Sequence, residues 1–193
     1  MRVFYILGYP GVGKTTAVSW MLSSLGVTPE PYDDPVPHTR YGGVVHLGRQ
    51  RFPFGGTDTL SLSIQPLVTT WLITETRNLI VVGEGDRLAN AKFFDSIRAA
   101  RIPLHIAALD LLPSEARARS LARAAEHGVR EQSLTWFQGR VTKVDNLVGR
   151  YRCTHIDAHQ PPEAVAKELW AAAALPDGLV SARVRPVERP AGT

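Results

Sequence analysis

The sequence predicts an α/β fold with a mainly parallel sheet and helices on both of its faces. Short apolar segments that are typical of buried strands lie at residues 3–7, 79–82, 104–109 and 153–156. Segments with helical periodicity alternate with them, at residues 14–25, 88–100 and 161–174. Strands that alternate with helices form a parallel sheet covered on both faces. The chain has 193 residues, enough to bury the core of one such domain, which we place at 1–175.

The predicted elements begin and end at recognisable residues. In the first helix, Val18, Met21 and Leu22 lie on one face, and the helix ends before Gly26. Pro161 and Pro162 suit the first turn of the last helix. The tail, 176–193, has no periodicity, so we expect it to be mobile.

Two regions interrupt this alternation. Residues 28–66 are rich in Pro and Gly and contain an expected inserted hairpin at 41–48, whereas residues 113–150 are rich in arginine. Insertions that follow the carboxyl ends of parallel strands flank the ligand crevice of an α/β sheet. We therefore expect both regions to border the functional site.

Composition excludes several classes of protein. Hydrophobic residues make up 44% of the chain and charged residues 21%, as in ordinary globular proteins. The single cysteine, Cys153, rules out a disulfide framework and a cysteine-rich zinc site. The apolar run at the N-terminus is too short for a signal peptide, and no run approaches the ~18 apolar residues of a membrane span. We expect a cytoplasmic protein.

The net charge of +4 is concentrated in one part of the chain. Residues 115–152 hold eight Lys or Arg against four Asp or Glu, so the rest of the chain is neutral. A concentrated basic segment indicates a polyanionic partner. The alternative is a solvated helix face without a binding role.

Residues 8–15 match the pattern G-x-x-x-x-G-K-[ST], which binds the phosphates of nucleotides. Its glycines let the backbone N–H groups point at phosphate oxygens, beside the positive end of the next helix. Lys14 would reach the β- and γ-phosphates of ATP, and the hydroxyl of Thr15 would hold Mg²⁺. The residues expected to bind the nucleotide are Gly8, Pro10, Gly11, Val12, Gly13, Lys14, Thr15, Thr16 and Arg119.

Carboxylates follow the strand predicted at 79–82. Enzymes with this phosphate-binding loop need an acidic group beside Mg²⁺, usually at the end of a neighbouring strand. Glu84 and Asp86 are two residues apart, so one can hold the metal while the other orients or deprotonates a hydroxyl. Arg87 would clamp a phosphate. In the alternative, only Glu84 is functional and Asp86 caps the next helix.

Asp58 is a further acidic candidate. It lies in a flexible turn with several hydroxyl groups, at residues 55–61. Such a carboxylate either contacts an acceptor substrate or caps a helix, and the sequence leaves both alternatives open.

The arginine-rich stretch is expected to form a lid. Arg119, Arg123 and Arg130 are spaced by four and seven, so a helix would place them on one face unless Gly128 breaks it. Small-molecule kinases close such a lid over the phosphates and exclude water. Arg140 would add positive charge near the transferred phosphoryl group. Trp136 and Phe137 either stack on a base or, as we favour, pack under the lid.

Two weaker patterns are set aside. Residues 142–145 read T-K-x-D, like the guanine-binding motif of GTPases, but they do not end a predicted strand and no D-x-x-G switch accompanies them. His155 and His159 fall across a strand end and a loop, so we do not expect them to bind a metal.

Taken in order, residues 8–15, 56–58, 84–87 and 139–143 resemble the phage-encoded P-loop kinases, which include kinases of 5-hydroxymethyluracil in DNA. The resemblance covers roughly residues 1–170. Asp86 and Arg87 also resemble the Asp-Arg motif of thymidylate and deoxynucleoside kinases, although other motifs of those enzymes are missing. The resemblance implies a P-loop NTPase three-layer sandwich, use of ATP and Mg²⁺, and DNA with a modified pyrimidine as partner, in the host cytoplasm.

The sequence therefore predicts a P-loop kinase with 28–66 on the acceptor side and 113–150 as the lid. Thr15 and Glu84 would hold the metal. Arg40, Arg49 and Arg51 would line the acceptor side with Asp58. The alternatives are a nucleoside or nucleoside-monophosphate kinase and, in another class, an ATPase or GTPase switch. The expected catalytic residues are Lys14, Asp58, Glu84, Asp86, Arg87, Arg123, Arg130 and Arg140.

Overall fold

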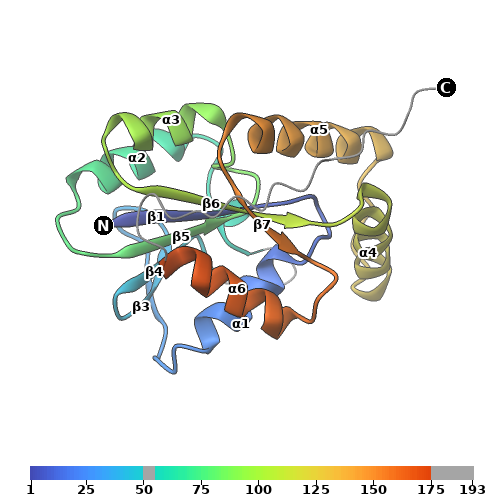
Figure 1. Cartoon of the computed structure of the whole chain (residues 1–193), viewed down its shortest axis with the longest axis horizontal. Coiled ribbons are helices and arrows are strands. Elements are labelled where there is room, and N and C mark those ends of the chain that lie inside the picture. The colour runs from blue at the N-terminus through green and yellow to red at the C-terminus, as the bar shows by residue number, and fades with distance from the viewer. Residues whose placement is uncertain (50–54, 175–193) are drawn as a thin grey trace.

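The computed structural model describes residues 1–49 and 55–174, and its seven strands form one mixed sheet in the order β2-β3-β4-β5-β1-β6-β7 (Figure 1). The strands are β1 (Arg2–Leu7), β2 (Glu30–Tyr32), β3 (His38–Tyr41), β4 (Val44–Leu47), β5 (Ile80–Glu84), β6 (Leu104–Asp110) and β7 (Thr154–Asp157). The helices are α1 (Lys14–Ser23), α2 (Gln65–Thr74), α3 (Ala91–Ala99), α4 (Pro113–Glu126), α5 (Leu134–Arg150) and α6 (Pro162–Ala174), with a 3₁₀ turn, η1, at Thr57–Thr59. Arg51 and the tail predicted to be mobile, 176–193, lie outside the described residues.

The centre of the sheet is parallel. β1 pairs in parallel with β5 on one side and with β6 on the other, and β4 and β7 extend the parallel part outward. Val3 to Leu7 of β1 are all buried, which explains why this strand reads as a continuous apolar run. Parallel pairing aligns the carboxyl ends of these strands at one edge of the sheet, where ligands bind in α/β proteins.

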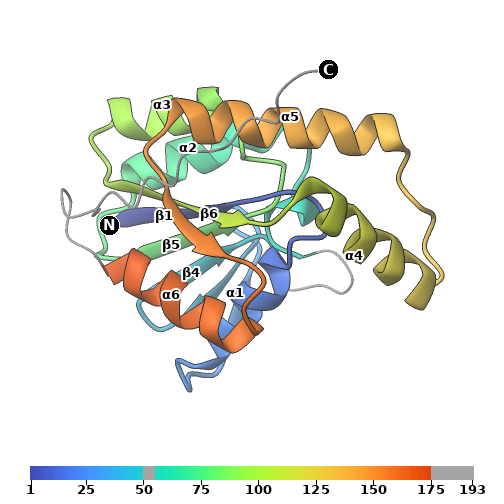
Figure 2. The same cartoon turned by 45° about the vertical axis from the view of Figure 1, so that its right-hand side comes forward.

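Helices cover both faces of the sheet, which confirms the predicted three-layer α/β sandwich. Figures 1 and 2 show α1 and α6 on one face and α2, α3 and α5 on the other. Each face has its own apolar core, one around Met21 and Leu169 and one around Phe93 and Leu72. Helix α4 lies beside the carboxyl-terminal edge of the sheet (Figure 2).

The region 28–66 is more regular than predicted. Its hairpin exists as β3 and β4, but β4 pairs in parallel with β5, so the hairpin extends the main sheet instead of forming an insertion. All four residues of β4 are buried, as suits a strand with neighbours on both sides. Helix α2 was not predicted, because its sequence, QPLVTTWLIT, has no charged residue and is rich in residues that favour strands.

Helix boundaries decide two alternatives that the sequence leaves open. Helix α3 begins at Ala91 because the side chain of Asn90 accepts a hydrogen bond from the backbone N–H of Phe93 at 2.9 Å, so Asp86 is not the cap. The arginine-rich stretch forms two helices, not one, since Gly128 has a φ of 59° just after α4 ends. Arg130 therefore lies between the helices and does not share a face with Arg119 and Arg123.

No helix in the ranges 1–49 and 55–174 is both long enough and apolar enough to pass through a membrane.

Candidate active site

The phosphate-binding loop connects the end of β1 to the start of α1, as its sequence predicts. Gly8, Gly11 and Gly13 all have positive φ values, of 150°, 88° and 100°. A Cβ atom at Gly11 would lie 2.2 Å from the backbone oxygen of Ala116 in α4, so only glycine allows α4 to approach the loop this closely. At Gly13 the space around a Cβ atom is open.

Lys14, the first residue of α1, is folded back onto the loop. Its ammonium group donates hydrogen bonds to the backbone oxygens of Gly8 at 2.8 Å and Tyr9 at 3.0 Å. Burial lowers the pKa of Lys14 from its ordinary value, while the nearby carboxylates, Glu84 first among them, act in the opposite direction. The lysine is thus held beside the loop by contacts that an incoming phosphate can replace.

Thr15, in the first turn of α1, contacts Glu84, the last residue of β5. The Thr15 hydroxyl donates to Glu84 Oε1 at 3.2 Å, and Glu84 is 1% exposed. Burial raises the pKa of Glu84 to about 7, although Lys14 pulls it down. A hydroxyl and a carboxylate are the hard oxygen ligands that suit Mg²⁺, and a cation would replace the proton that burial favours. The two predicted metal ligands therefore fit together.

The turn at η1 interlocks with the end of β5. Thr57 donates to the backbone oxygen of Glu84 at 2.7 Å, and the buried Tyr5 donates to the backbone oxygen of Gly85 at 2.8 Å. A Cβ atom at Gly56 would lie 2.3 Å from Glu84 Oε1, and one at Gly85 would lie 2.9 Å from the carboxyl carbon of Asp58. Two separate sequence motifs thus form one rigid piece at the carboxyl end of β5.

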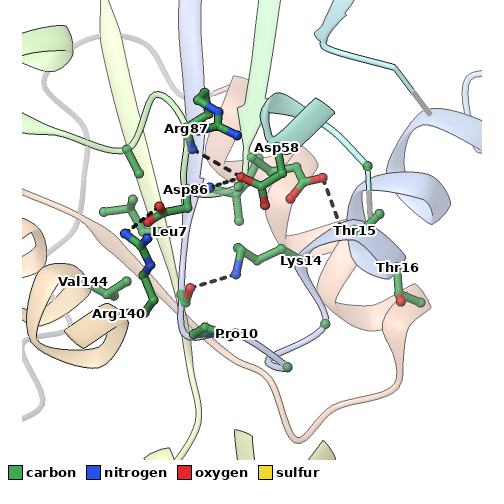
Figure 3. Close-up of a pocket in the computed structure, with 18 of the residues that line it drawn as sticks. Leu7, Pro10, Lys14, Thr15, Thr16, Asp58, Asp86, Arg87, Arg140 and Val144 are labelled. Carbon is green, nitrogen blue, oxygen red and sulfur yellow. Dashed lines mark hydrogen bonds and ion pairs between the residues drawn. The ribbon is translucent and has the colours of Figure 1, made fainter. Parts of the chain in front are cut away.

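The carboxylates of Asp58 and Asp86 lie in this piece in different environments. Asp58 Oδ1 accepts the backbone N–H groups of Asp86 at 2.7 Å and Arg87 at 3.3 Å. Within the described part of the chain, Asp58 Oδ2 has no hydrogen-bond partner, and the residue is exposed at the cavity. Figure 3 shows Asp58 and Lys14 projecting toward the same space.

Both oxygens of Asp86 are bound by cations from α5. Lys143 donates to Asp86 Oδ1 at 2.7 Å and to its backbone oxygen at 3.0 Å. Arg140 pairs with Asp86 Oδ2 at 2.8 Å (Figure 3). The guanidinium of Arg140 also lies over the ring of Trp136, 5.1 Å from the centroid. The sequence analysis named Arg140 as a catalytic candidate and had Lys143 only within the motifs at 139–143 and 142–145, although their spacing of three residues places both on one face of a helix.

One cavity of about 680 Å³ brings these groups together. Each of the four motifs found in the sequence, at residues 8–15, 56–58, 84–87 and 139–143, contributes residues to the walls of this cavity. The predicted site residues that line it are Gly8, Pro10, Gly11, Gly13, Lys14, Thr15, Thr16, Asp58, Glu84, Asp86, Arg87, Arg123 and Arg140. Trp136 also lines it, whereas its neighbour Phe137 is buried, so the favoured packing role holds for Phe137.

A second cavity of about 490 Å³ adjoins the first. It shares Gly11, Gly13, Thr16 and Arg123 with the first cavity and is closed on its far side by the loop between β7 and α6. Arg119 and Val12 line this second space, and Arg119 Nη1 donates to the backbone oxygen of Ala158 at 3.1 Å. The two cavities therefore meet over the phosphate-binding loop.

Among the described residues, three predicted site arginines line neither cavity: Arg130, Arg40 and Arg49. Arg40 of β3 lies over the ring of Tyr32, 5.1 Å from its centroid, and Arg49 pairs with Asp33. The prediction that they line the acceptor side with Asp58 is therefore not matched by these cavities.

Arg130 has a different place. It is exposed in the connection between α4 and α5, because α4 ends at Glu126. Arg87 lines the first cavity, and its Nε is buried with no hydrogen-bond partner among residues 1–49 and 55–174.

Two groups of contacts near the phosphate-binding loop involve residues that the sequence analysis did not predict to be in the site. Tyr9 Oη donates to Asp145 Oδ1 of α5 at 2.6 Å, and burial raises the pKa of this tyrosine well above its ordinary range. His159, at the second cavity, contacts Asp157 at 2.7 Å and Glu115 at 2.9 Å, and these carboxylates raise its pKa. Across the described ranges, no group of three or more His, Cys, Asp or Glu is arranged to hold a metal.

The motif T-K-x-D at 142–145 lies inside α5 and not at the end of a strand. It does not have the placement of a guanine-binding motif. Lys143 and Asp145 of this segment instead contact Asp86 and Tyr9.

This fold and this loop define a P-loop phosphotransferase of the α/β kinase type. Comparison with protein families supports the same class: the family model P-loop Nucleotide Kinase3 matches residues 1–165. The chain belongs to the P-loop nucleotide kinase 3 family. A comparison with curated proteins gives no match.

Solved structures share the fold. A gluconokinase from Sinorhizobium meliloti 1021 is similar with a TM-score of 0.54 and 16% identity, over 90% of this chain and 91% of that chain. A tunicamycin resistance protein from Deinococcus radiodurans is similar with a TM-score of 0.52 and 17% identity, over 91% of this chain and 97% of that chain. At this identity the similarity establishes the fold alone.

Proposed function

We propose that the protein transfers the γ-phosphate of ATP to a hydroxyl group on a nucleotide or a modified base. The leading acceptor is the 5-hydroxymethyl group of 5-hydroxymethyluracil in DNA. The observation that carries the proposal is the single cavity in which Lys14 and Thr15 face Asp58. Phosphoryl transfer depends mainly on positioning and on electrostatic stabilisation, and this cavity supplies groups for both.

The donor nucleotide would span the two cavities. Its phosphates would lie on the loop at the N-terminus of α1, where the N–H groups and the helix dipole favour anions. Its base would occupy the second cavity, between Arg119 and the loop that follows β7. Lys14 would exchange its two backbone contacts for the phosphates, and Arg123, which borders both cavities, would lie over them.

Thr15 and Glu84 would hold Mg²⁺ beside these phosphates. The few protein ligands suit this ion, which keeps several waters and takes its other ligands from the nucleotide. When bound, the ion neutralises charge on the phosphate oxygens. Deprotonation of Glu84 accompanies its binding, because burial raises the pKa of the free carboxyl to about 7.

Asp58 is the carboxylate best placed to bind the acceptor hydroxyl. One of its oxygens is fixed by two backbone N–H groups, and the other faces the cavity. In this arrangement Asp58 would orient the hydroxyl and take its proton as the phosphoryl group transfers. Asp86 is less suited to this role, since Arg140 and Lys143 already bind both of its oxygens. Arg87 would supply its unpartnered Nε to a phosphate of the acceptor.

The choice of acceptor is supported by the resemblance to kinases of hydroxymethyluracil in DNA. The motifs that carry this resemblance come from distant parts of the chain and gather at one cavity. A base in duplex DNA would have to be flipped or single-stranded to reach Asp58. Arg49, whose exposed side chain pairs with Asp33 at 2.6 Å, would bind a phosphate of the flanking DNA in exchange for this pair.

One assay tests the proposal. The purified protein is incubated with labelled ATP and Mg²⁺, together with free nucleosides, nucleoside monophosphates, plain DNA or DNA with hydroxymethyluracil. We expect transfer to the modified DNA and none to thymine DNA, with an affinity that falls as salt rises. Efficient transfer to thymidine monophosphate alone would instead identify a nucleotide kinase. Rapid ATP hydrolysis without any transfer would point to a switch.

The second candidate function, phosphorylation of a free nucleoside monophosphate, is favoured by one structural observation. Most cations of the basic stretch contact other parts of this protein, which leaves fewer of them for the phosphates of a polymer. Arg117 donates to the backbone oxygen of Gln132, Arg119 to that of Ala158, and Arg150 pairs with Asp95. A free nucleotide needs only a few cations, and Arg87 with Arg123 would suffice.

A further inference from the structure

Helix α5 contacts both sides of the active-site cleft through neighbouring residues. On the donor side, Asp145 accepts the hydrogen bond of Tyr9, which is part of the phosphate-binding loop. On the acceptor side, Lys143 donates twice to Asp86. These two residues of α5 are separated by one position, so a rigid helix fixes the distance between the loop and the acceptor side.

We propose that α5 aligns the two substrates and that Lys143 is the positioning residue through which it holds the acceptor side. The inference rests on the proposed function, because alignment matters only if a phosphoryl group passes between two bound partners. It adds a role for a residue that was not among the predicted catalytic residues and does not line either cavity.

The contacts form a continuous chain from α5 to the catalytic carboxylate. Lys143 holds the backbone oxygen of Asp86, and the N–H group of the same residue donates to Asp58 Oδ1 at 2.7 Å. The N–H of Arg87 donates to the same oxygen at 3.3 Å. Because these bonds determine where the second oxygen of Asp58 points, a shift of the Asp86 backbone would move the group that orients the acceptor.

The ionic part of the contact reinforces this chain. The side chains of Lys143 and Asp86 are 28% and 38% exposed, so their pair is partly shielded from water. Arg140 occupies the other carboxylate oxygen and lies over Trp136, which keeps the pair from rotating freely. Because both of its oxygens contact cations of α5, the Asp86 carboxylate holds this helix against the end of β5.

The test compares Lys143→Met with a matched variant on the same helix. Arg150→Met removes a cation from the exposed end of α5, where Arg150 pairs with Asp95 away from the cleft. We expect Lys143→Met to lower kcat with the best acceptor by roughly tenfold to a hundredfold, the scale on which small misplacements act. Its Kd for ATP should change less than twofold, and Arg150→Met should keep wild-type kcat.

A second measurement does not depend on the acceptor. Hydrogen exchange at the amides of Asp86 and Arg87 reports whether their bonds to Asp58 persist. We expect faster exchange there in Lys143→Met than in Arg150→Met, with no change in the strand β1. A double variant with Asp86→Asn should lose no more activity than the stronger single variant, since both would act through one contact.

The outcomes separate this inference from the proposed function. If the wild-type protein transfers phosphate to no acceptor, the proposed function fails, and the exchange measurement still decides whether Lys143 holds the segment. If transfer occurs but Lys143→Met behaves like Arg150→Met in both measurements, the positioning role is overturned. Equal losses of kcat, ATP affinity and thermal stability would also overturn it, because they would mean a purely structural lysine.

Discussion

Helices α4 and α5 come from one arginine-rich stretch, but their cations contact different parts of the cleft. On α4, Arg119 donates to a backbone oxygen at the second cavity, and Arg123 borders both cavities. On α5, Arg140 and Lys143 bind a carboxylate at the end of β5. The difference teaches that a basic segment need not have one partner: under the proposed function, the cations of α4 would bind the nucleotide and those of α5 would act on the acceptor side.

Lys14 lines the same cavity as Arg123 of α4 and Arg140 of α5, and its removal should have the largest effect. Lys14→Ala removes a cation from the transferring phosphate while β1 and α1 remain intact. We expect turnover to fall by roughly a hundredfold to a thousandfold, the scale for lost transition-state electrostatics. Steady-state kinetics measure the turnover, and circular dichroism shows whether the variant is folded. A folded Lys14→Ala variant with wild-type turnover would remove the basis for placing the phosphates on the loop before α1.

Glu84 should show the next effect, and it concerns stability as well as activity. Burial raises its pKa from an ordinary value near 4.5 to about 7, so the folded state keeps a proton that the unfolded chain has lost between these pH values. The free energy of unfolding contributed by this group therefore falls as pH rises from about 4.5 to about 7. At pH 8, Glu84→Gln should be more stable than the wild type by up to about 3 kcal/mol, and the two should differ little at pH 4.

Urea unfolding of the ligand-free proteins at both pH values measures this difference. In the same variant, the Mg²⁺ concentration needed for half-maximal turnover should rise, because the amide is a weaker ligand than a carboxylate. If Glu84→Gln is no more stable at pH 8 than the wild type, the charged Glu84 carboxylate is already stabilised by neighbouring groups such as Lys14.

Asp58→Asn sharpens the comparison on the side of α5. The amide keeps the shape of the carboxylate but cannot accept a proton, so we expect turnover to fall about tenfold to a hundredfold with ATP affinity unchanged. Asp86→Asn should lower turnover less, since the acceptor would not contact Asp86 directly. Steady-state kinetics of both variants with the same acceptor test the ranking. A larger loss in Asp86→Asn would exchange the roles of these two carboxylates.

The smallest effects are expected when one arginine is removed from α4 or from α5. Arg119→Ala should raise KM for ATP by about fivefold with little change in kcat, whereas Arg140→Ala should lower kcat by about fivefold with little change in KM for ATP. Equal changes in both variants would mean that the two helices act as one lid. A closing lid would also make trypsin cleavage within 113–150 slower when nucleotide is added.

The sequence predicted the central fold well because its information there is local. Apolar strands and a glycine-rich loop are consecutive residues, and β1, β5 and β6 lie where their patterns place them. Helix α2 was not predicted because half of its residues are β-branched and none is charged, so its sequence shows no helical pattern of apolar and polar residues. Its packing against the rest of the protein makes it a helix.

The site was predicted as a set of residues but not as an arrangement. Asp58, Glu84 and Asp86 were all predicted as catalytic residues. Their order in the chain could not show which of these carboxylates keeps an oxygen in the cavity without a hydrogen-bond partner from the described residues. That distinction depends on Lys143, which is 57 positions from Asp86 in the chain. Contacts at such separation depend on how the helices pack, and a single sequence has no pattern that reports them.

The two cavities share part of their walls over the phosphate-binding loop, which has a consequence for inhibitor design. A molecule that joins adenosine to an acceptor mimic through a chain of phosphates would occupy both spaces at once. Once one end is bound, the other is confined near its own site, and the effective concentration of the second end can reach the millimolar range. Such a bisubstrate compound would bind much more tightly than either half, and its best linker length would measure the distance that the phosphoryl group travels.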